Sequence, residues 1–352
     1  MEKGIHLKGL NGIRFFAALS VLLSHTFAAY EQLGFKRIVE GWDIADYGVT
    51  MFFTLSGFLI TWLLHKEKAA FGTISISKFY IRRILRIWPL YYFFILLVLI
   101  IAYHMKFPAG LSYYLFMAAN IPFVSASWLP LLSHYWSLAV EEQFYLFWPW
   151  LLKWFPPIRS ITLFLIFFLM LKGILRIWIP ETAAYQFMVI TRFDCMAIGG
   201  LAAVLLNGDK RFTAICFGWP AQLLSWIIVL LAVTGYFKLP GFINHDVFAL
   251  ACAVIIVNVA FNKNPLVGLN YKLFEFLGRI SYGIYIYHVL IIYLLGLVIK
   301  GRLLLFDGIS QLILVIFAVV VSTILVAWLS FELLEKPFLR LKHQFSKVTS
   351  RS

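Results

Sequence analysis

The stretch LNGIRFFAALSVLLSHTFAAY, residues 10–30, is long and apolar enough to form one membrane-spanning helix, yet it contains an arginine and a histidine. Arg14 and His25 are eleven positions apart. On an α-helix this spacing gives about 1100° of rotation and a rise of about 16 Å, so the two side chains share one face. An arginine at the middle of a membrane helix costs about 2.5–3.5 kcal/mol, and ionisable residues persist there mainly where they line a polar cavity or have a function. We therefore interpret this face as the wall of a reaction chamber or pathway.

The composition of the chain indicates an integral membrane protein. Of its 352 residues, 62% are hydrophobic, 18% are aromatic and only 13% are charged. A soluble domain of this size cannot bury so much apolar surface. The formal net charge is +14, but no basic run resembles a nucleic-acid-binding patch, so we expect the lipid bilayer and no nucleic acid as a partner.

Ten segments are long and apolar enough to cross a bilayer, which takes about 20 residues of helix. They lie at residues 10–30, 47–65, 88–104, 135–154, 158–178, 190–207, 213–235, 242–261, 278–299 and 309–333. With the N-terminus inside, most Lys and Arg residues fall in cytoplasmic segments, so the positive-inside rule predicts that both termini are cytoplasmic. The sequence thus predicts an all-α, polytopic membrane protein with about ten transmembrane helices, a break near Pro180, and a re-entrant or interfacial helix at Leu111–Val124.

We expect one transmembrane domain over residues 1–340 and a short basic cytoplasmic tail over residues 341–352. The first span is not a cleavable signal peptide, because it is too long and ends without an A-x-A site. The three cysteines are scattered singly, which suggests neither a disulfide framework nor a metal cluster, and no metal is expected. Soluble-enzyme signatures such as the P-loop and HExxH are absent, and Ser56 and Ser281 lack the glycines of a nucleophile elbow.

Three arginines mark the start of the third span, in SKFYIRRILRIWPLYY at residues 77–92. Arg82 and Arg86 are four positions apart and therefore share a helix face. Together with Arg83 they could hold a phosphorylated donor, since guanidinium groups bind phosphate bidentately. The alternative is that these residues only anchor the helix at the lipid headgroups.

Two adjacent glutamates lie near the start of the fourth span, in HYWSLAVEEQFYLFWPW at residues 134–150. Neighbouring residues of a helix face different ways, so we expect one of Glu141 and Glu142 to point into the bundle. A carboxylate there could orient or charge-stabilise a histidine. The alternative is a structural ion pair with Arg192 or Lys172.

Two later spans carry further polar residues. In TRFDCMAIGGLAAVL, residues 191–205, Arg192 and Asp194 precede small residues that allow close helix packing, and we favour an intramembrane salt bridge. In LGRISYGIYIYHVLIIY, residues 277–293, Ser281, Tyr285 and His288 are spaced as one polar stripe. We favour a hydrogen-bonded structural role for His288 over a catalytic one.

Seven blocks of sequence, in this order, resemble those of the acyltransferase-3 family of integral membrane acyltransferases. The blocks are GIRFFAALSVLLSH (12–25), YGVTMFFTLSGFLI (47–60), FYIRRILRIWPLY (79–91), YWSLAVEEQFYLFWP (135–149), RFDCMAIGGLAA (192–203), LGRISYGIYIYHV (277–289) and FELLEKPF (331–338). The resemblance implies ten core helices and the transfer of acyl groups, usually acetyl from acetyl-CoA, to extracytoplasmic glycans and other acceptors.

The same resemblance implies roles for individual residues. The R-x(10)-H motif that is regarded as catalytic in the family corresponds to Arg14 and His25, and the glutamate of V-E-E-Q-F-Y corresponds to Glu141. The cytoplasmic arginine cluster, which would bind the donor, corresponds to Arg82, Arg83 and Arg86. The possible supporting residues are Glu142, Arg192, Asp194, Ser281, Tyr285 and His288.

We expect an O-acyltransferase of the cytoplasmic (inner) membrane, in the first instance an O-acetyltransferase, whose acceptor is a hydroxyl group of a cell-envelope saccharide, such as lipopolysaccharide, or of an exported saccharide. His25 would act as the general base on the acceptor hydroxyl, because an imidazole titrates near neutral pH. Arg14, about 16 Å nearer the cytoplasm, would hold the donor or close the pore. Some family members carry a fused periplasmic hydrolase-like domain, and we expect this chain to lack it and to act alone or with a separate periplasmic transferase.

Two other classes of function remain open. A transporter or flippase for a lipid-linked glycan or an acyl donor would also need charges within the membrane, but the chain shows no paired halves with interrupted helices at corresponding positions. A non-catalytic sensor or scaffold would not need an arginine and a histidine on one helix face. Consumption of a thioester by the purified protein separates the enzyme from both.

Overall fold

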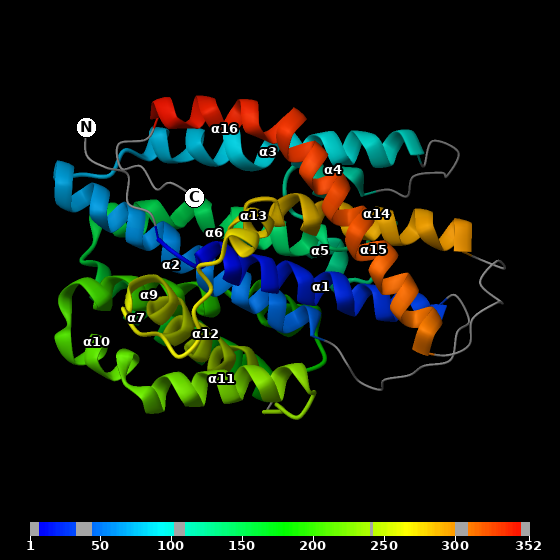
Figure 1. Ribbon diagram of the computed structural model, residues 1–352. Helices are drawn as coiled ribbons and strands as arrows, with labels where there is room; N and C mark the ends of the chain where they lie inside the picture. The colour runs from blue at the N-terminus through cyan, green and yellow to red at the C-terminus, as the bar shows by residue number, and fades with distance from the viewer. Residues whose placement is uncertain (1–6, 33–43, 102–109, 240–241, 300–308, 346–352) are drawn as a thin grey trace.

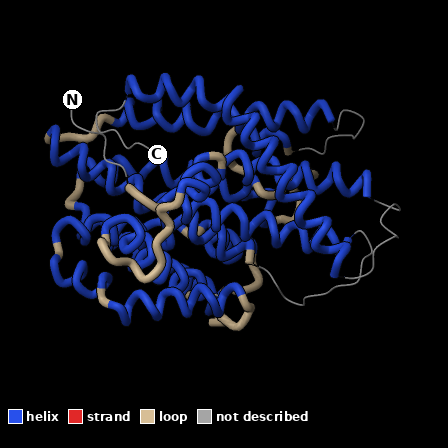
Figure 2. The backbone as a smooth tube through the Cα atoms, viewed as in Figure 1, coloured by secondary structure: helices blue, strands red, loops and turns tan. Residues whose placement is uncertain are grey.

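The computed structural model describes residues 7–32, 44–101, 110–239, 242–299 and 309–345, and every regular element in them is helical (Figures 1 and 2). The longer helices are α1 (Leu10–Gln32), α2 (Ala45–Phe71), α3 (Ile76–Ile101), α6 (Tyr135–Trp154), α7 (Pro157–Trp178), α9 (Phe193–Gly208), α11 (Trp219–Val233), α12 (Asn244–Phe261), α14 (Ser281–Ile299) and α15 (Ile309–Ser330). The shorter ones are α4 (Leu111–Leu115), α5 (Asn120–Val124), α8 (Ala183–Thr191), α10 (Lys210–Phe217), α13 (Lys272–Arg279), the π-helical turn η1 (Phe331–Glu335), α16 (Lys336–Lys342) and the 3₁₀ turn η2 (His343–Phe345).

The expected membrane spans correspond to the longer helices, so the all-helical fold is confirmed. Among the described residues, eight helices are long and apolar enough to cross a membrane, and nine if the pair α10 and α11, bent by 60°, forms one span. Helix α6 has 20 residues but is not among them, and it carries the two glutamates and Gln143.

Two finer expectations concern segments between the spans. The break near Pro180 is confirmed, because α7 ends at Trp178 and α8 begins at Ala183. The segment Leu111–Val124 contains α4 and α5, which have five residues each and are too short to cross a bilayer. Its interfacial or re-entrant position remains a prediction.

Helices α2 and α9 pack backbone to backbone through glycines. A Cβ atom on Gly57 would collide with the backbone of Met196, and one on Gly199 would collide with the carbonyl of Thr54. Small residues let membrane helices approach this closely. The expected close packing after Arg192 is therefore confirmed, and it fixes α2, which carries part of the candidate site, against the rest of the bundle.

The start of α1, the start of α3 and the end of α16 lie at the same end of the bundle (Figure 1). Arg14 on α1 and Lys342 on α16 line one cavity there. Arg82 on α3 donates a 3.0 Å hydrogen bond to the carbonyl of Phe345. We call this the arginine end of the bundle, after Arg14, Arg83 and Arg86. The side of the membrane that it faces remains a prediction from the charge distribution.

Candidate active site

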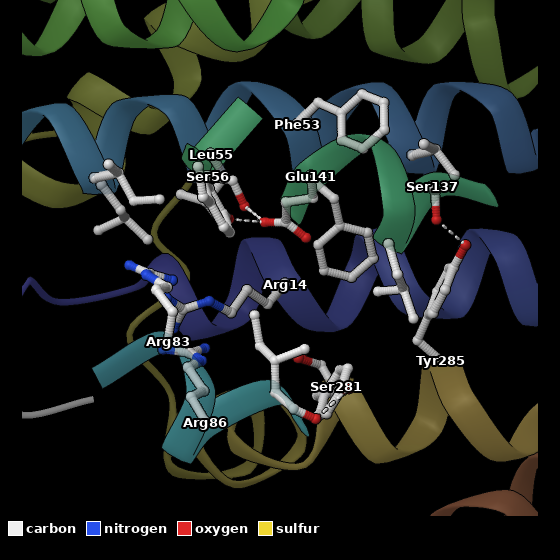
Figure 3. A pocket seen from close by; sticks show the side chains of 18 of the residues that line it. Arg14, Phe53, Leu55, Ser56, Arg83, Arg86, Ser137, Glu141, Ser281 and Tyr285 are labelled. Atoms are coloured by element: carbon white, nitrogen blue, oxygen red, sulfur yellow. Dashed lines mark hydrogen bonds between the residues drawn. The ribbon is translucent and has the colours of Figure 1, made fainter. Parts of the chain in front are cut away.

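A cavity of about 120 Å³ lies between α1, α2, α3, α6 and α14, and we call it the central cavity. Figure 3 shows how its polar side chains follow one another in space along the bundle. Arg14, Arg83 and Arg86 lie at one side, Glu141 and Ser56 in the middle, and Ser137 and Tyr285 at the other side. Ser281 also lines this cavity. The expected polar wall along the bundle is thus formed by five helices and not by α1 alone.

The arginine end of the central cavity is formed by Arg14, Arg83 and Arg86. A guanidinium nitrogen of Arg14 donates a 2.5 Å hydrogen bond to the side-chain oxygen of Asn11, whose amide donates at 2.7 Å to Glu275. These bonds fix the direction of the Arg14 side chain. The guanidinium group of Arg83 lies 4.9 Å above the ring of Tyr145, a cation–π distance.

The structure does not bring Arg82 into the lining of this cavity. Its guanidinium group is bound to the carboxylate of Glu67 on α2, at 3.3 Å. The pair that faces the cavity from α3 is therefore Arg83 and Arg86, three positions apart, and not the expected pair of Arg82 and Arg86.

The carboxylate of Glu141 points into the central cavity and accepts hydrogen bonds from the hydroxyl groups of Ser56 and Tyr145. Glu142 does not line the cavity, and its buried Oε1 has no hydrogen-bond partner among the described residues. One glutamate of the pair thus faces inward, as expected. The structure does not place Glu141 against a histidine.

His25 and His288 form a hydrogen-bonded pair, with 2.8 Å between Nδ1 of His25 and Nε2 of His288. Nδ1 of His288 lies 2.6 Å from the carbonyl oxygen of Tyr285, which can only accept, so this nitrogen carries the proton. A neutral His288 then has an unprotonated Nε2, which accepts the proton of Nδ1 of His25. The lone pair of His25 is thereby directed to its Nε2, the form that a general base requires.

His25 opens into a different cavity from Arg14. This histidine cavity has a volume of about 490 Å³ and is lined by α1, α14 and the segment around Ser133. Tyr285 connects the two sites: its ring lines the central cavity, its carbonyl holds His288, and its hydroxyl lies 2.5 Å from Oγ of Ser137. The distance between Arg14 and His25 along α1 explains why neither of these two cavities is lined by both.

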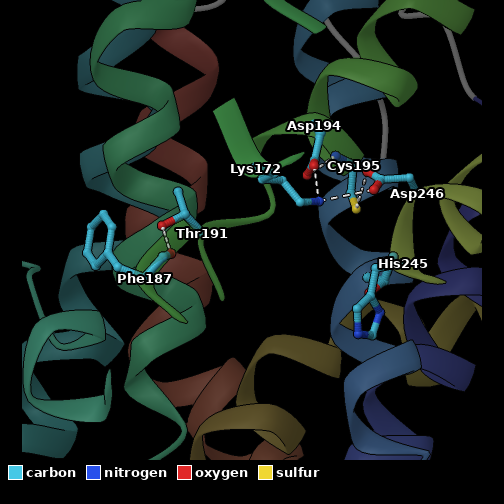
Figure 4. A network of polar contacts seen from close by, with 8 residues as sticks. Lys172, Phe187, Thr191, Asp194, Cys195, His245 and Asp246 are labelled. Atoms are coloured by element: carbon cyan, nitrogen blue, oxygen red, sulfur yellow. Dashed lines mark hydrogen bonds and ion pairs between the residues drawn. The ribbon is translucent and has the colours of Figure 1, made fainter. Parts of the chain in front are cut away.

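Neither Arg192 nor Asp194 lines these cavities, and Asp194 belongs to a buried ionic network between α7, α9 and α12 (Figure 4). Nζ of Lys172 binds the carboxylate of Asp194 and, at 3.0 Å, that of Asp246. Arg192 binds Asp46 at 3.1 Å. Arg192 and Asp194 thus each form a salt bridge with a partner on another helix, and the expected position of these pairs within the membrane remains a prediction.

The same contacts exclude the ion pair considered for the glutamates. Lys172 and Arg192 bind aspartates, and neither binds Glu141 or Glu142. Asp194, Cys195 and Asp246 are also near enough to one another to hold a metal ion. The ammonium group of Lys172 binds both carboxylates, however, and occupies the position that a cation would take.

Four residues that line these cavities were not predicted from the sequence: Asn11, Ser56, Tyr145 and Lys342. Asn11 lies three positions before Arg14, and Tyr145 lies four positions after Glu141. Residues at these spacings are neighbours on a helix, so both could have been predicted from their distance along the chain to a candidate residue. Ser56 was set aside because it lacks flanking glycines, and only the packing of α2 on α6 reveals its contact with Glu141.

Comparison with known proteins agrees with the seven blocks. A family model described as an acyltransferase domain (acyltransferase-3) matches residues 7–332. The peptidoglycan O-acetyltransferase OatA of Listeria monocytogenes is 28% identical over 375 residues, which cover 94% of this chain and 56% of the relative. The O-acetyltransferase OatA of Staphylococcus aureus is 26% identical and is covered to 57%.

The chain thus spans little more than half the length of these relatives. No solved structure matches it. Because the family model covers most of the chain, including every helix that lines the central cavity, the chain belongs to the acyltransferase-3 family.

Proposed function

We propose that the chain is a membrane O-acyltransferase that moves an acyl group, acetyl in the first instance, from acyl-CoA to a hydroxyl group of a cell-envelope or exported saccharide. The observation that supports this most is the run of polar groups from the arginine end, past Glu141, to Tyr285 and the His25–His288 pair. One relative is named a peptidoglycan O-acetyltransferase, which supports a saccharide as acceptor.

The donor would bind at the arginine end. Arg14, Arg83 and Arg86 present guanidinium groups, which suit phosphate groups of coenzyme A. The positive-inside rule predicts that this end faces the cytoplasm, the side from which acyl-CoA would enter. The pantetheine arm, which carries amide groups, would follow the central cavity past Ser56 and Glu141 and bring the thioester towards Tyr285.

His25 would act as the general base. Its Nε2 takes the proton of the acceptor hydroxyl while the hydroxyl oxygen attacks the thioester carbonyl. The carbon–sulfur bond then breaks, the oxygen keeps the acyl group, and the thiolate of coenzyme A receives the proton from His25. His288 is a positioning residue in this scheme, because it sets which nitrogen of His25 carries the lone pair.

The direct test is thioester consumption by the purified full chain in detergent, with acetyl-CoA as donor and a panel of envelope saccharides as acceptors. Release of free thiol together with acetylated saccharide, identified by mass spectrometry, is the expected result. Transport of a lipid-linked glycan or an acyl donor in vesicles without any thiol release would contradict the proposal and favour the transporter. Activity only with an added envelope protein would indicate a separate periplasmic transferase.

Replacing Arg83 or Arg86 with lysine tests whether the arginines bind the donor or only anchor the helix. Lysine keeps the charge but loses the planar fork, so we expect the KM for acetyl-CoA to rise about tenfold, the scale of one charge-assisted hydrogen bond. Steady-state kinetics measure this. Arg211→Lys is the matched control, since Arg211 is exposed on α10 and lines none of these cavities. Wild-type KM in both Arg83→Lys and Arg86→Lys would contradict a donor site here.

A further inference from the structure

A third cavity, of about 80 Å³, adjoins the central cavity at the arginine end, and we call it the α16 cavity. The two share Arg14, Arg86 and Tyr282 in their linings. Beyond these residues the α16 cavity is lined by Lys342 and Glu335 from the C-terminal helical segment. The C-terminal segment is therefore a wall of the candidate donor site, and it includes Lys342, which the sequence predicted only as part of a basic tail.

The local sequence explains why Lys342 reaches this cavity. Glu335, Leu339 and Lys342 are spaced at i, i+4 and i+7, so they share one helix face, and all three line the cavity. The π-helical turn Phe331–Glu335 precedes them, and such turns are frequent at functional sites. On the other face, Glu332 and Lys336 bind each other at the surface.

The C-terminal helix is held in place along α3 (Figure 1). The hydrogen bond from Arg82 to the carbonyl of Phe345 fixes the residues that follow Lys342. Arg82, on α3, is in turn held against α2 by its ion pair with Glu67. Arg82 therefore contributes to the donor site by anchoring its wall.

The two adjoining cavities carry an excess of positive charge. Their described lining contains more cationic than acidic side chains, namely Arg14, Arg83, Arg86 and Lys342 against Glu141 and Glu335, while a further cation, Arg279, lies 4.0 Å from Glu275. Like charges at a poorly hydrated site are unfavourable unless an anion lies between them. A phosphomonoester carries about −1.5 to −2 charges near neutral pH, so one such group would compensate more than one of these cations.

We propose that the α16 cavity binds the phosphomonoester of the acyl-CoA donor, its 3′-phosphate, and that Lys342 is a donor-binding residue. This proposal rests on the proposed function. The 3′-phosphate is at the end of coenzyme A remote from the thioester, and the α16 cavity is reached through Arg14 and Arg86 from the cavity that would hold the pantetheine arm. The diphosphate would then bind Arg14 and Arg86, which line both cavities.

Equilibrium binding of coenzyme A and 3′-dephospho-coenzyme A to the purified full chain tests this, independently of turnover. We expect the wild type to bind coenzyme A about tenfold more tightly than the dephospho form, and Lys342→Gln to reduce this preference towards one by weakening only the binding of coenzyme A. Lys336→Gln is the matched control, because Lys336 lies on the same helix, pairs with Glu332 at the surface and should leave the preference intact.

Three results would overturn the assignment. Equal loss of both ligands in Lys342→Gln would make Lys342 a structural residue or a ligand of the diphosphate. An unchanged preference in Lys342→Gln would place the 3′-phosphate elsewhere. A wild type without preference, whose melting temperature rises with phosphatidylglycerol or with inorganic phosphate in a Lys342-dependent way, would assign the cavity to a lipid headgroup or to free phosphate. Lack of turnover by a wild type that shows the preference would instead count against the proposed function alone.

Discussion

Replacing His25 with alanine is expected to lower acyl transfer about a hundredfold or more while the protein remains folded and inserted. General bases contribute about 10²–10⁴-fold to the rates of such reactions, and His25 is the residue that would take the proton of the acceptor hydroxyl. The measurement is the initial rate of thiol release with acetyl-CoA and acceptor. Donor binding should stay nearly intact, since His25 lies in a different cavity from the arginines.

Two further variants make this expectation specific. His65→Ala is the matched control, because His65 lies on α2 and lines none of the three cavities. His288→Ala should lower the rate less than His25→Ala, since it removes the partner that fixes the proton on Nδ1 of His25 and not the base itself. Near-normal turnover in a well-expressed His25→Ala protein would contradict the proposed role of His25 as the general base.

Much of the fold was predictable because the bilayer imposes length and hydropathy on each span. The expected spans all contain helices, and the break near Pro180 lies where the apolar run stops. The bounds of α6 were predicted as well, as residues 135–154, but this helix is not among the candidate membrane spans, because a helix that turns Glu141 into a cavity is less apolar than the others.

The candidate site was predictable only in part, because spacing within one helix does not reveal partners on another. The periodicity of α3 favoured Arg82 and Arg86 as a pair, but Glu67 on α2 binds Arg82. Similarly, Arg14 and His25 share a face of α1, yet His25 meets His288 of α14. These contacts join residues far apart in the chain, so they depend on helix packing that local patterns do not specify.

The ionic network of Lys172 shows the same limit and leads to the second large effect. The sequence indicated a salt bridge at Arg192 and Asp194, but it gave no reason to join Lys172 on α7 to Asp194 on α9 and Asp246 on α12. All three side chains are buried in the described structure. Removing the ammonium group would leave two carboxylates without their shared cation in a medium of low polarity.

We therefore expect Lys172→Met to destabilise the folded protein by about 3–5 kcal/mol, the usual cost of breaking a buried ion pair from one side. Thermal melting in detergent, followed by the loss of monodisperse protein, measures this. The double variant Lys172→Met/Asp194→Asn should recover part of the stability, because it also removes one of the orphaned charges.

Lys263→Met is the matched control for this change, since Lys263 is exposed after α12 and should be neutral. The KM for acetyl-CoA should stay near the wild-type value in the Lys172→Met protein that remains folded, because the network lines none of the three cavities. A melting temperature equal to that of the wild type would mean that the two carboxylates do not depend on Lys172 for compensation. A large change in donor KM at unchanged stability would instead connect the network to the donor site, and the separation of a structural network from a catalytic cavity would then be wrong.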